Sequence, residues 1–318
     1  MRTGLAAGVG AYLLWGLFPL YWPLLEPAAP VEILAHRIAW SLVFLAGLLA
    51  LTTGFRWVRT LGRRRARLLA LAAALITVNW GMFIYGVNSD QVVETSLGYF
   101  INPLVTVALA VGVLRERLRP EQRLAVAIAA VAVLVLRERL RTEQRIAVAI
   151  AALAVAILTI DYGRPPWLAL TLAFSFGLYG LVKKRADVEG AQSLAVETAF
   201  VALPAIAYIA FLEADGRGTM LGEGAGHVAL LLGGGVVTAV PLILFGAAAI
   251  RIPLTTVGLL QYMTPTLHFL IGVLVYSEPM PASRLAGFAL VWVALAVLTV
   301  GAVRSARTAR LTVAPAAS

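Results

Sequence analysis

Long apolar segments separated by short polar loops dominate the chain. Nine of them reach spanning length, at residues 4–25, 31–53, 67–88, 93–114, 165–182, 191–212, 226–249, 253–276 and 282–303. A shorter pair lies at residues 124–136 and 146–160. A helix needs about 20 apolar residues to cross the hydrocarbon core of a bilayer. The pattern therefore predicts an all-α integral membrane protein with nine helices assigned by length, and it leaves the shorter pair open.

Composition agrees with a membrane protein and excludes several other classes. Of the 318 residues, 61% are hydrophobic and 13% are charged, whereas soluble domains are roughly 25% charged. The net charge of +10 does not indicate nucleic-acid binding, because no basic and aromatic platform accompanies it. Cysteine is absent, and His36, His227 and His268 form no HExxH zinc motif. We expect no metal and no cofactor.

The distribution of arginine predicts the orientation. Basic loops of membrane proteins face the cytoplasm, where the leaflet carries anionic lipid. The loop after the second segment contains Arg56, Arg59, Arg63, Arg64, Arg65 and Arg67. The loop after the third contains Asp90 and Glu94 and no base. We expect a multi-pass protein of the cell membrane with both termini in the cytoplasm, its basic loops facing the anionic cytoplasmic leaflet.

A tandem duplication complicates the count of spans. Residues 113–134 recur directly as residues 135–156, and 18 of the 22 positions match. If both apolar copies cross the membrane, the basic residues 183–185 lie outside, and if one crosses they lie inside. The uncharged part of the first copy, residues 124–136, is short for a span. We predict ten spans, with the first copy forming an extra short helix at the cytoplasmic side. The alternative is that both copies insert against the charge rule.

The two halves of the chain also match each other weakly. Gly16 matches Gly177, Thr77 matches Thr238, Pro103 matches Pro265, Glu116 matches Glu278, and Arg37 lies opposite Glu197, all at offsets of 160–162 residues. Five crossings per half would turn the second half upside down. The basic segment RERLR of the first half corresponds to YSEPMP in the second, where the arginines are gone. Inverted repeats of this kind are typical of secondary transporters.

Several segments carry a family resemblance. GLFPLYW (16–22), EILAHRIAWS (32–41), SLGYFINPLVTV (96–107) and LQYMTPTLHFLIGVLVYSEPM (260–280) are among those that resemble RarD-type permeases of the EamA branch of the drug/metabolite transporter superfamily. The resemblance covers residues 4–303 and implies ten transmembrane helices in two inverted five-helix EamA repeats, 4–160 and 165–303. It also implies transport of a small solute, by export in many members. Only the extra 22-residue copy departs from the pattern. We expect residues 304–318 to form a disordered cytoplasmic tail, and a homodimer is left open.

Two ionisable residues inside predicted spans are candidates for function. A charge in a membrane helix is costly and usually faces a cavity or a partner. For Arg37 the alternatives are contact with solute, snorkelling outward or an ion pair with Glu32. Glu197 is the only carboxylate well inside a predicted span. It is a candidate for proton coupling, and the alternative is a structural hydrogen bond to a neighbouring helix.

The matched prolines suggest where polar groups gather. Pro103 and Pro265 are candidate helix breaks, because each leaves the carbonyl four residues earlier without its usual amide partner. Freed backbone is tolerated in a membrane where it is buried in protein or lines a polar cavity. The residues expected to line a solute cavity are Trp15, Tyr21, Arg37, Asn79, Trp80, Tyr99, Asn102, Tyr179, Gln261, Tyr262 and His268.

These features favour a secondary transporter of a small organic solute, working by alternating access and driven by a proton gradient or the solute gradient. No phosphate-binding GxxxxGK[ST] loop is present, so ATP is not the expected direct energy source. A lipid-modifying enzyme would need a cluster of acid, base or metal-binding groups, which the sequence does not offer. A channel would favour a ring of repeated pore residues. A purely structural membrane protein would not need the inverted repeat.

Overall fold

The computed structural model describes residues 2–114, 150, 153–154, 156–188, 190–249, 251–252, 256 and 260–312. All regular secondary structure in these ranges is helical. The tandem duplication lies almost wholly outside them, and so does the question of how many of its copies cross the membrane. Residues 313–318 of the expected tail are also outside the described residues, whereas residues 304–312 continue the last helix.

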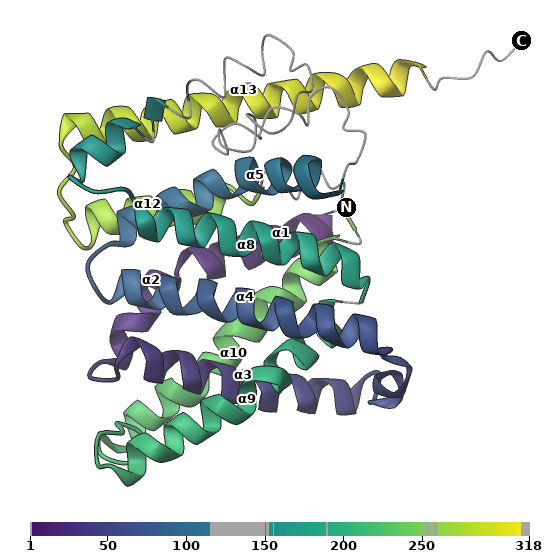
Figure 1. Cartoon of the computed structure of the whole chain (residues 1–318), viewed down its shortest axis with the longest axis vertical. Helices are drawn as coiled ribbons and strands as arrows, with labels where there is room; N and C mark the ends of the chain where they lie inside the picture. The colour runs from purple at the N-terminus through teal and green to yellow at the C-terminus, as the bar shows by residue number, and fades with distance from the viewer. Residues whose placement is uncertain are drawn as a thin grey trace, which may run out of the picture. The chain divides into compact units, whose positions relative to one another are not determined.

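The described helices follow the apolar segments closely (Figure 1). They are α1 (Arg2–Gly16), α2 (Phe18–Tyr21), η1 (Trp22–Leu25), α3 (Pro30–Leu51), η2 (Arg56–Thr60), α4 (Arg63–Val87), α5 (Val92–Leu114), α8 (Trp167–Ala186), α9 (Gly190–Ala214), α10 (Gly224–Ala249), α12 (Met263–Leu274) and α13 (Ala282–Thr312). By length and composition, four of these helices can cross a membrane, namely α3, α4, α9 and α10. A fifth candidate is the bent pair Arg2–Gly16 and Phe18–Leu25. The chain is therefore a helical membrane protein.

Two of the predicted spans are interrupted in the structure. The first bends by 45° after Gly16, where Pro19 and Pro23 start the short helices α2 and η1. Proline cannot donate a backbone hydrogen bond, so it costs none in the first turn of a new helix, whereas inside a helix it removes one. The segment predicted at residues 253–276 contains a turn at Gln261 and Tyr262, and α12 begins only at Met263.

The described chain divides into two compact units. Unit 1 comprises residues 1–96 and 182–278, and unit 2 comprises residues 97–181 and 279–318. In unit 1, α3 packs against α4, α9 and α10, while α1 packs against α10 and α12. Figure 1 shows α3, α9 and α10 crossing one another, so helices from both halves of the chain form one core.

Unit 2 is held by small residues, aromatic contacts and one ion pair. Gly98 of α5 faces the backbone of Ala169 on α8, so the two helices approach closely. Phe100 packs edge to face against Trp292 of α13. Arg284 Nε donates to Asp161 Oδ2 at 2.8 Å. Burial opposes ionisation of Asp161, but hydrogen bonds from Ser283 and Arg284 and the charge of Arg284 outweigh it, so the pKa of Asp161 is lowered.

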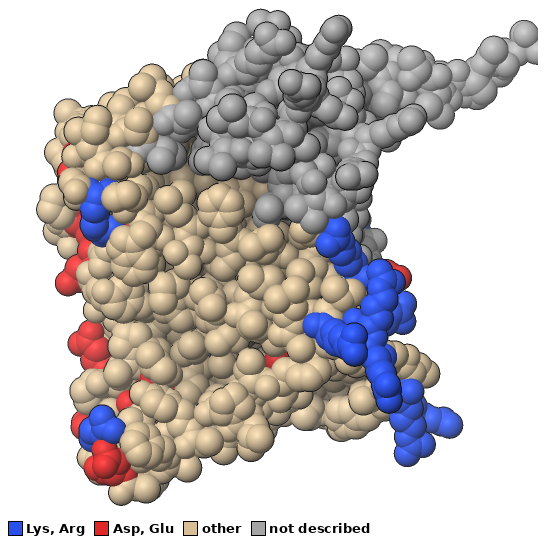
Figure 2. All heavy atoms as spheres, in the orientation of Figure 1, with Lys and Arg blue, Asp and Glu red and all other residues tan. Residues whose placement is uncertain are grey.

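Unit 1 has a basic end and an acidic end. Arg65, in the first turn of α4, lies 3.7 Å from Asp187, which follows α8, so the α3–α4 and α8–α9 connections share one end. Glu32 at the start of α3 accepts a hydrogen bond from the Thr219 amide (2.8 Å) and so joins the α9–α10 loop to the opposite end. Figure 2 shows Lys and Arg gathered at one end and most Asp and Glu at the other. The asymmetry is the one that membrane insertion produces.

Close contact between α3 and α10 depends on a glycine. A Cβ atom on Gly235 would lie 2.5 Å from the carbonyl carbon of Trp40, and backbone cannot move aside as a flexible side chain can. The sequence predicts that Gly233, Gly234 and Gly235 let helices pack closely, and at Gly235 this is confirmed.

Replacing Gly235 by alanine should therefore force α3 and α10 apart. We expect Gly235→Ala to cost about 1–3 kcal/mol, as overpacking does elsewhere, and to lower the melting temperature of the detergent-solubilised protein. Gly47→Ala on α3 is the matched control, because nothing lies within 4 Å of its added Cβ. An unchanged melting temperature for Gly235→Ala would contradict the packing described.

Candidate functional site

The guanidinium of Arg37 lies in the core of unit 1. Arg37 is only 4% exposed, and its Nε donates a 2.9 Å hydrogen bond to the Thr238 hydroxyl of α10. Three aromatic rings surround the guanidinium carbon, with centroids at 4.1 Å (Trp80), 5.0 Å (Trp22) and 5.5 Å (Phe18). Four helical elements, α2, η1, α4 and α10, thus converge on one charge carried by α3.

These contacts bear on two of the alternatives for Arg37, the ion pair with Glu32 and snorkelling outward. Glu32 accepts hydrogen bonds from the amide and hydroxyl of Thr219, at 2.8 and 2.9 Å, so its carboxylate holds a loop. Arg37 points instead toward Thr238, whose own hydroxyl donates to the Gly234 carbonyl at 2.8 Å and keeps its lone pairs for the guanidinium. Flat aromatic faces stabilise a desolvated guanidinium by cation–π attraction, so the charge is enclosed by protein.

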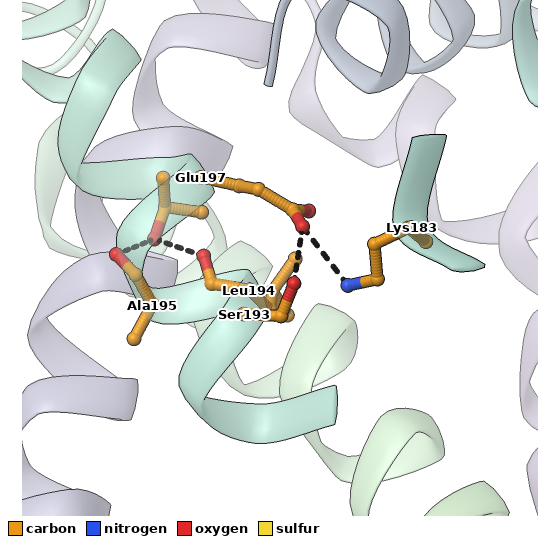
Figure 3. A network of polar contacts seen from close by, with 6 residues as sticks. Lys183, Ser193, Leu194, Ala195 and Glu197 are labelled. Carbon is orange, nitrogen blue, oxygen red and sulfur yellow. Dashed lines mark hydrogen bonds and ion pairs between the residues drawn. The ribbon is translucent and has the colours of Figure 1, made fainter. Parts of the chain in front are cut away.

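Glu197 lies in a second polar cluster near the basic end (Figure 3). It is 1% exposed, and its Oε1 accepts hydrogen bonds from Lys183 Nζ of α8 (2.9 Å) and from the Ser193 hydroxyl one turn earlier on α9 (2.6 Å). The side chain of Lys183 is 23% exposed. The cluster thus connects a buried carboxylate to a partly exposed lysine.

A third polar contact joins α12 to α1 and α4. His268 is 2% exposed, and its Nε2 lies 3.0 Å from the carbonyl oxygen of Trp15. Its ring stacks on Phe83 at a centroid distance of 5.0 Å. Trp15 packs in turn against Tyr12 and Phe245. His268 and Trp15, both predicted cavity residues, are thus in direct contact.

The remaining predicted residues are distributed over both units. In unit 1, the Tyr21 hydroxyl donates to the Leu230 carbonyl, Asn79 is buried, and Gln261 and Tyr262 form the turn before α12. In unit 2, Asn102 is buried, and Tyr99 and Tyr179 both pack against Phe176. Arg37, Trp80, Trp15 and His268 therefore engage in direct tertiary contacts of unit 1, whereas three of the predicted residues belong to unit 2.

The two matched prolines have different local structures. Helix α5 runs from Val92 to Leu114 and so continues through Pro103. Pro265 is the third residue of α12, in the first turn, where a missing amide proton costs no helical hydrogen bond. The turn in this segment lies at Gln261 and Tyr262, directly before α12.

Several residues of the site were not among the sequence-predicted ones. Thr238, Trp22 and Phe18 surround Arg37, and Lys183 and Ser193 bind Glu197. The match of Thr238 to Thr77 was the one available signal for Thr238. Trp22 and Phe18 could not be predicted as partners of Arg37, because aromatic residues are common near membrane interfaces and nothing in the sequence distinguishes these two from the rest.

The described residues contain no group of three or more His, Asp or Glu arranged to hold a metal ion. The polar contacts that join helices in unit 1 include those of Arg37 with Thr238, Lys183 with Glu197, and His268 with Trp15.

Several known proteins are similar to this chain over most of its length. Residues 2–137 match the EamA-like transporter family. The chain is 50% identical to Protein RarD of Streptomyces exfoliatus, over 97% of this chain and 92% of that protein. It is 41% identical to the Uncharacterized transporter YojE of Bacillus subtilis, over 97% of each chain. A solved crystal structure with 17% identity superposes with a TM-score of 0.56 over 96% of this chain and 99% of that chain, which shows a shared fold. The chain therefore belongs to the EamA-like transporter family and is a RarD-type permease.

Proposed function

We propose that the protein is a secondary transporter that exports a small organic solute by alternating access, with Glu197 as a proton-coupling group. The observation that carries the proposal is Arg37, a permanent charge enclosed by aromatic rings and a hydroxyl inside a bundle of apolar helices. An intramembrane charge of this kind marks a solute or ion pathway in membrane proteins. The direction of export follows the family resemblance.

The register of the helices supports an inverted repeat. Arg37 is the eighth residue of α3 (Pro30–Leu51), and Glu197 is the eighth residue of α9 (Gly190–Ala214). Thr77 is the fifteenth residue of α4 (Arg63–Val87), and Thr238 is the fifteenth of α10 (Gly224–Ala249). The equivalence of α3 with α9 and of α4 with α10 thus extends to the position of each polar side chain along its helix.

Helix packing supports the same equivalence. The contact of α3 with α10 is matched by the contact of α9 with α4, both within unit 1. The contact of α1 with α12 in unit 1 has its counterpart in unit 2, where Gly98 of α5 faces Ala169 of α8. Two halves related by an axis in the membrane plane would produce these paired contacts, and rocking one half against the other would expose a central site to each side in turn.

The Arg65–Asp187 ion pair bears on the number of spans. It brings the α3–α4 and α8–α9 connections to one end of unit 1. With α4, α5 and α8 each crossing once, an odd number of crossings is then needed between α5 and α8. This supports ten spans, one crossing by the duplicated region, and a cytoplasmic basic end.

The contact between Glu197 and Lys183 suggests how proton binding could be linked to helix movement. Glu197 binds Lys183 of α8 as a carboxylate. A proton on Glu197 would remove the charge that holds Lys183, so α8 and α9 would be released from each other. Proton binding and helix movement would then be linked, as coupling requires. The structural alternative is that the pair only fixes α8 against α9.

Transport in proteoliposomes tests the function and the coupling together. With a library of small organic metabolites, we expect at least one solute to move without ATP and faster with an imposed pH gradient. Glu197→Gln should retain binding of that solute but lose the response to the gradient. Glu223→Gln, an exposed loop residue, is the matched control. If Glu197→Gln keeps the full pH response, Glu197 is not the coupling group, and if no solute moves, the transport proposal fails.

Arg37→Lys tests the enclosed charge. Lysine keeps the charge but cannot present a flat face to three rings or donate from an Nε to Thr238 in the same geometry. We expect transport to fall by about tenfold or more, since a desolvated cation–π contact contributes about 2 kcal/mol. Arg217→Lys, in an exposed loop, should transport normally. Normal transport by Arg37→Lys would show that only the charge matters.

A further inference from the structure

Two buried hydroxyls in unit 1, those of Ser41 and Thr77, lack a hydrogen-bond partner among the described residues, and Thr77 is the one on α4. The Oγ1 atom of Thr77 on α4 is inaccessible to solvent and forms no hydrogen bond in the described structure. Most threonines within helices avoid this by bonding to their own backbone, as Thr198 does to the Leu194 carbonyl at 2.8 Å. The Thr77 hydroxyl forms no such hydrogen bond to a backbone carbonyl one turn earlier on α4. A buried, unsatisfied hydroxyl is costly, so its retention calls for a physical reason.

The inverted repeat supplies a reason. Thr77 occupies the position of Thr238, and Glu197 occupies the position of Arg37. Thr238 accepts the hydrogen bond of Arg37 across the contact of α3 with α10. The equivalent contact is that of α4 with α9, which carries Thr77 and Glu197. Trp80, one turn beyond Thr77, packs against a cluster formed by Ala202 and Ala205 of α9 with Ala35 and Ile38 of α3, so this side of α4 faces both helices.

The two equivalent pairs are in different states. Arg37 and Thr238 are joined, and Gly235 is pressed against the backbone of Trp40 beside them. Glu197 is held instead by Ser193 and Lys183, and Thr77 is left without a hydrogen bond. In a protein built from two inverted halves, exchanging the conformations of the halves generates the opposite-facing state.

We infer that Thr77 is the hydroxyl that closes on Glu197 in the opposite-facing state, when Arg37 and Thr238 separate. This inference rests on the proposed alternating-access function and assigns Thr77 to its mechanism. In the state described, the Arg37–Thr238 bond holds α3 against α10. In the other, Glu197 is protonated and Lys183 is released, and the Thr77 hydroxyl donates to the carbonyl oxygen of the Glu197 carboxyl group and holds α4 against α9. Each threonine stabilises one state only, so the two form a matched pair of latches.

Single cysteines can report the two states, because the chain contains no cysteine of its own. Ser41 is the twelfth residue of α3 and fully buried beside the closed contact, and Val201 is the twelfth residue of α9. Ser41→Cys and Val201→Cys are made separately, each combined with Thr77→Val or Thr238→Val. The reaction rate with a membrane-impermeant maleimide is measured in nanodiscs, where both faces are accessible and orientation does not matter.

We expect Thr77→Val to slow labelling of Ser41→Cys by about fivefold, the effect of one net hydrogen bond on a two-state equilibrium. Labelling of Val201→Cys should not fall. Thr238→Val should have the reverse effect, with faster labelling of Ser41→Cys and slower labelling of Val201→Cys. Thr77→Ser keeps a hydroxyl and should behave like the parent, which separates loss of the latch from a general loss of packing.

The outcomes distinguish this inference from the function beneath it. If Thr77→Val leaves the labelling of Ser41→Cys unchanged or accelerates it while Thr238→Val shows its expected effect, Thr77 is not a latch and alternating access stands. If neither variant changes labelling at either reporter, both the inference and the alternating-access proposal are overturned.

Discussion

The structure of unit 1 depends on one constraint: the guanidinium of Arg37 cannot lose its proton and cannot be left in hydrocarbon. It must therefore be surrounded by groups that replace water. Trp22, Trp80 and Phe18 cover it with π-electron density, and Thr238 accepts from its Nε. These residues come from elements far apart in the sequence, so satisfying one charge fixes η1, α3, α4 and α10 against each other. The Gly235 contact brings α10 close enough to α3 for the bond to form.

Under the proposed alternating access, the same constraint would allow the helix bundle to change state. A bond between one charge and one hydroxyl is short-ranged, so a small separation of α3 from α10 breaks it. Glu197 and Lys183 form a comparable short-ranged contact between α9 and α8. Within the described residues, only a few polar contacts hold these apolar helices together. Such a bundle has a small number of distinct conformations, because each short-range contact is either formed or broken. A solute that interacts with Arg37 would compete for the group that holds one arrangement together.

The hydrophobic pattern was sufficient to predict the helical membrane fold, because lipid requires long apolar helices and satisfied backbone. The family was predicted from the resemblance of several segments to RarD-type permeases, which the comparisons confirm. The hydrophobic pattern could not predict the bend at Gly16 or the short α12, since both depend on local proline and turn geometry. The charge of Arg37 was recognisable in the sequence, but its partner was not. Glu32 is near in sequence, whereas Thr238 is 201 residues away and is brought close only by packing. The unpartnered state of Thr77 is likewise a property of the folded chain alone.

Mapping the sidedness of the loops tests the inverted arrangement most directly. Single cysteines at Thr60, Asp187, Leu221 and Pro165 are exposed and lie in four different connections. In intact cells treated with an impermeant thiol reagent, we expect Leu221→Cys and Pro165→Cys to react and Thr60→Cys and Asp187→Cys to be protected. In inverted vesicles the pattern should reverse. Reaction of Asp187→Cys from the side opposite to Thr60→Cys would mean that the halves are not inverted, and the account of the transporter given above would be wrong.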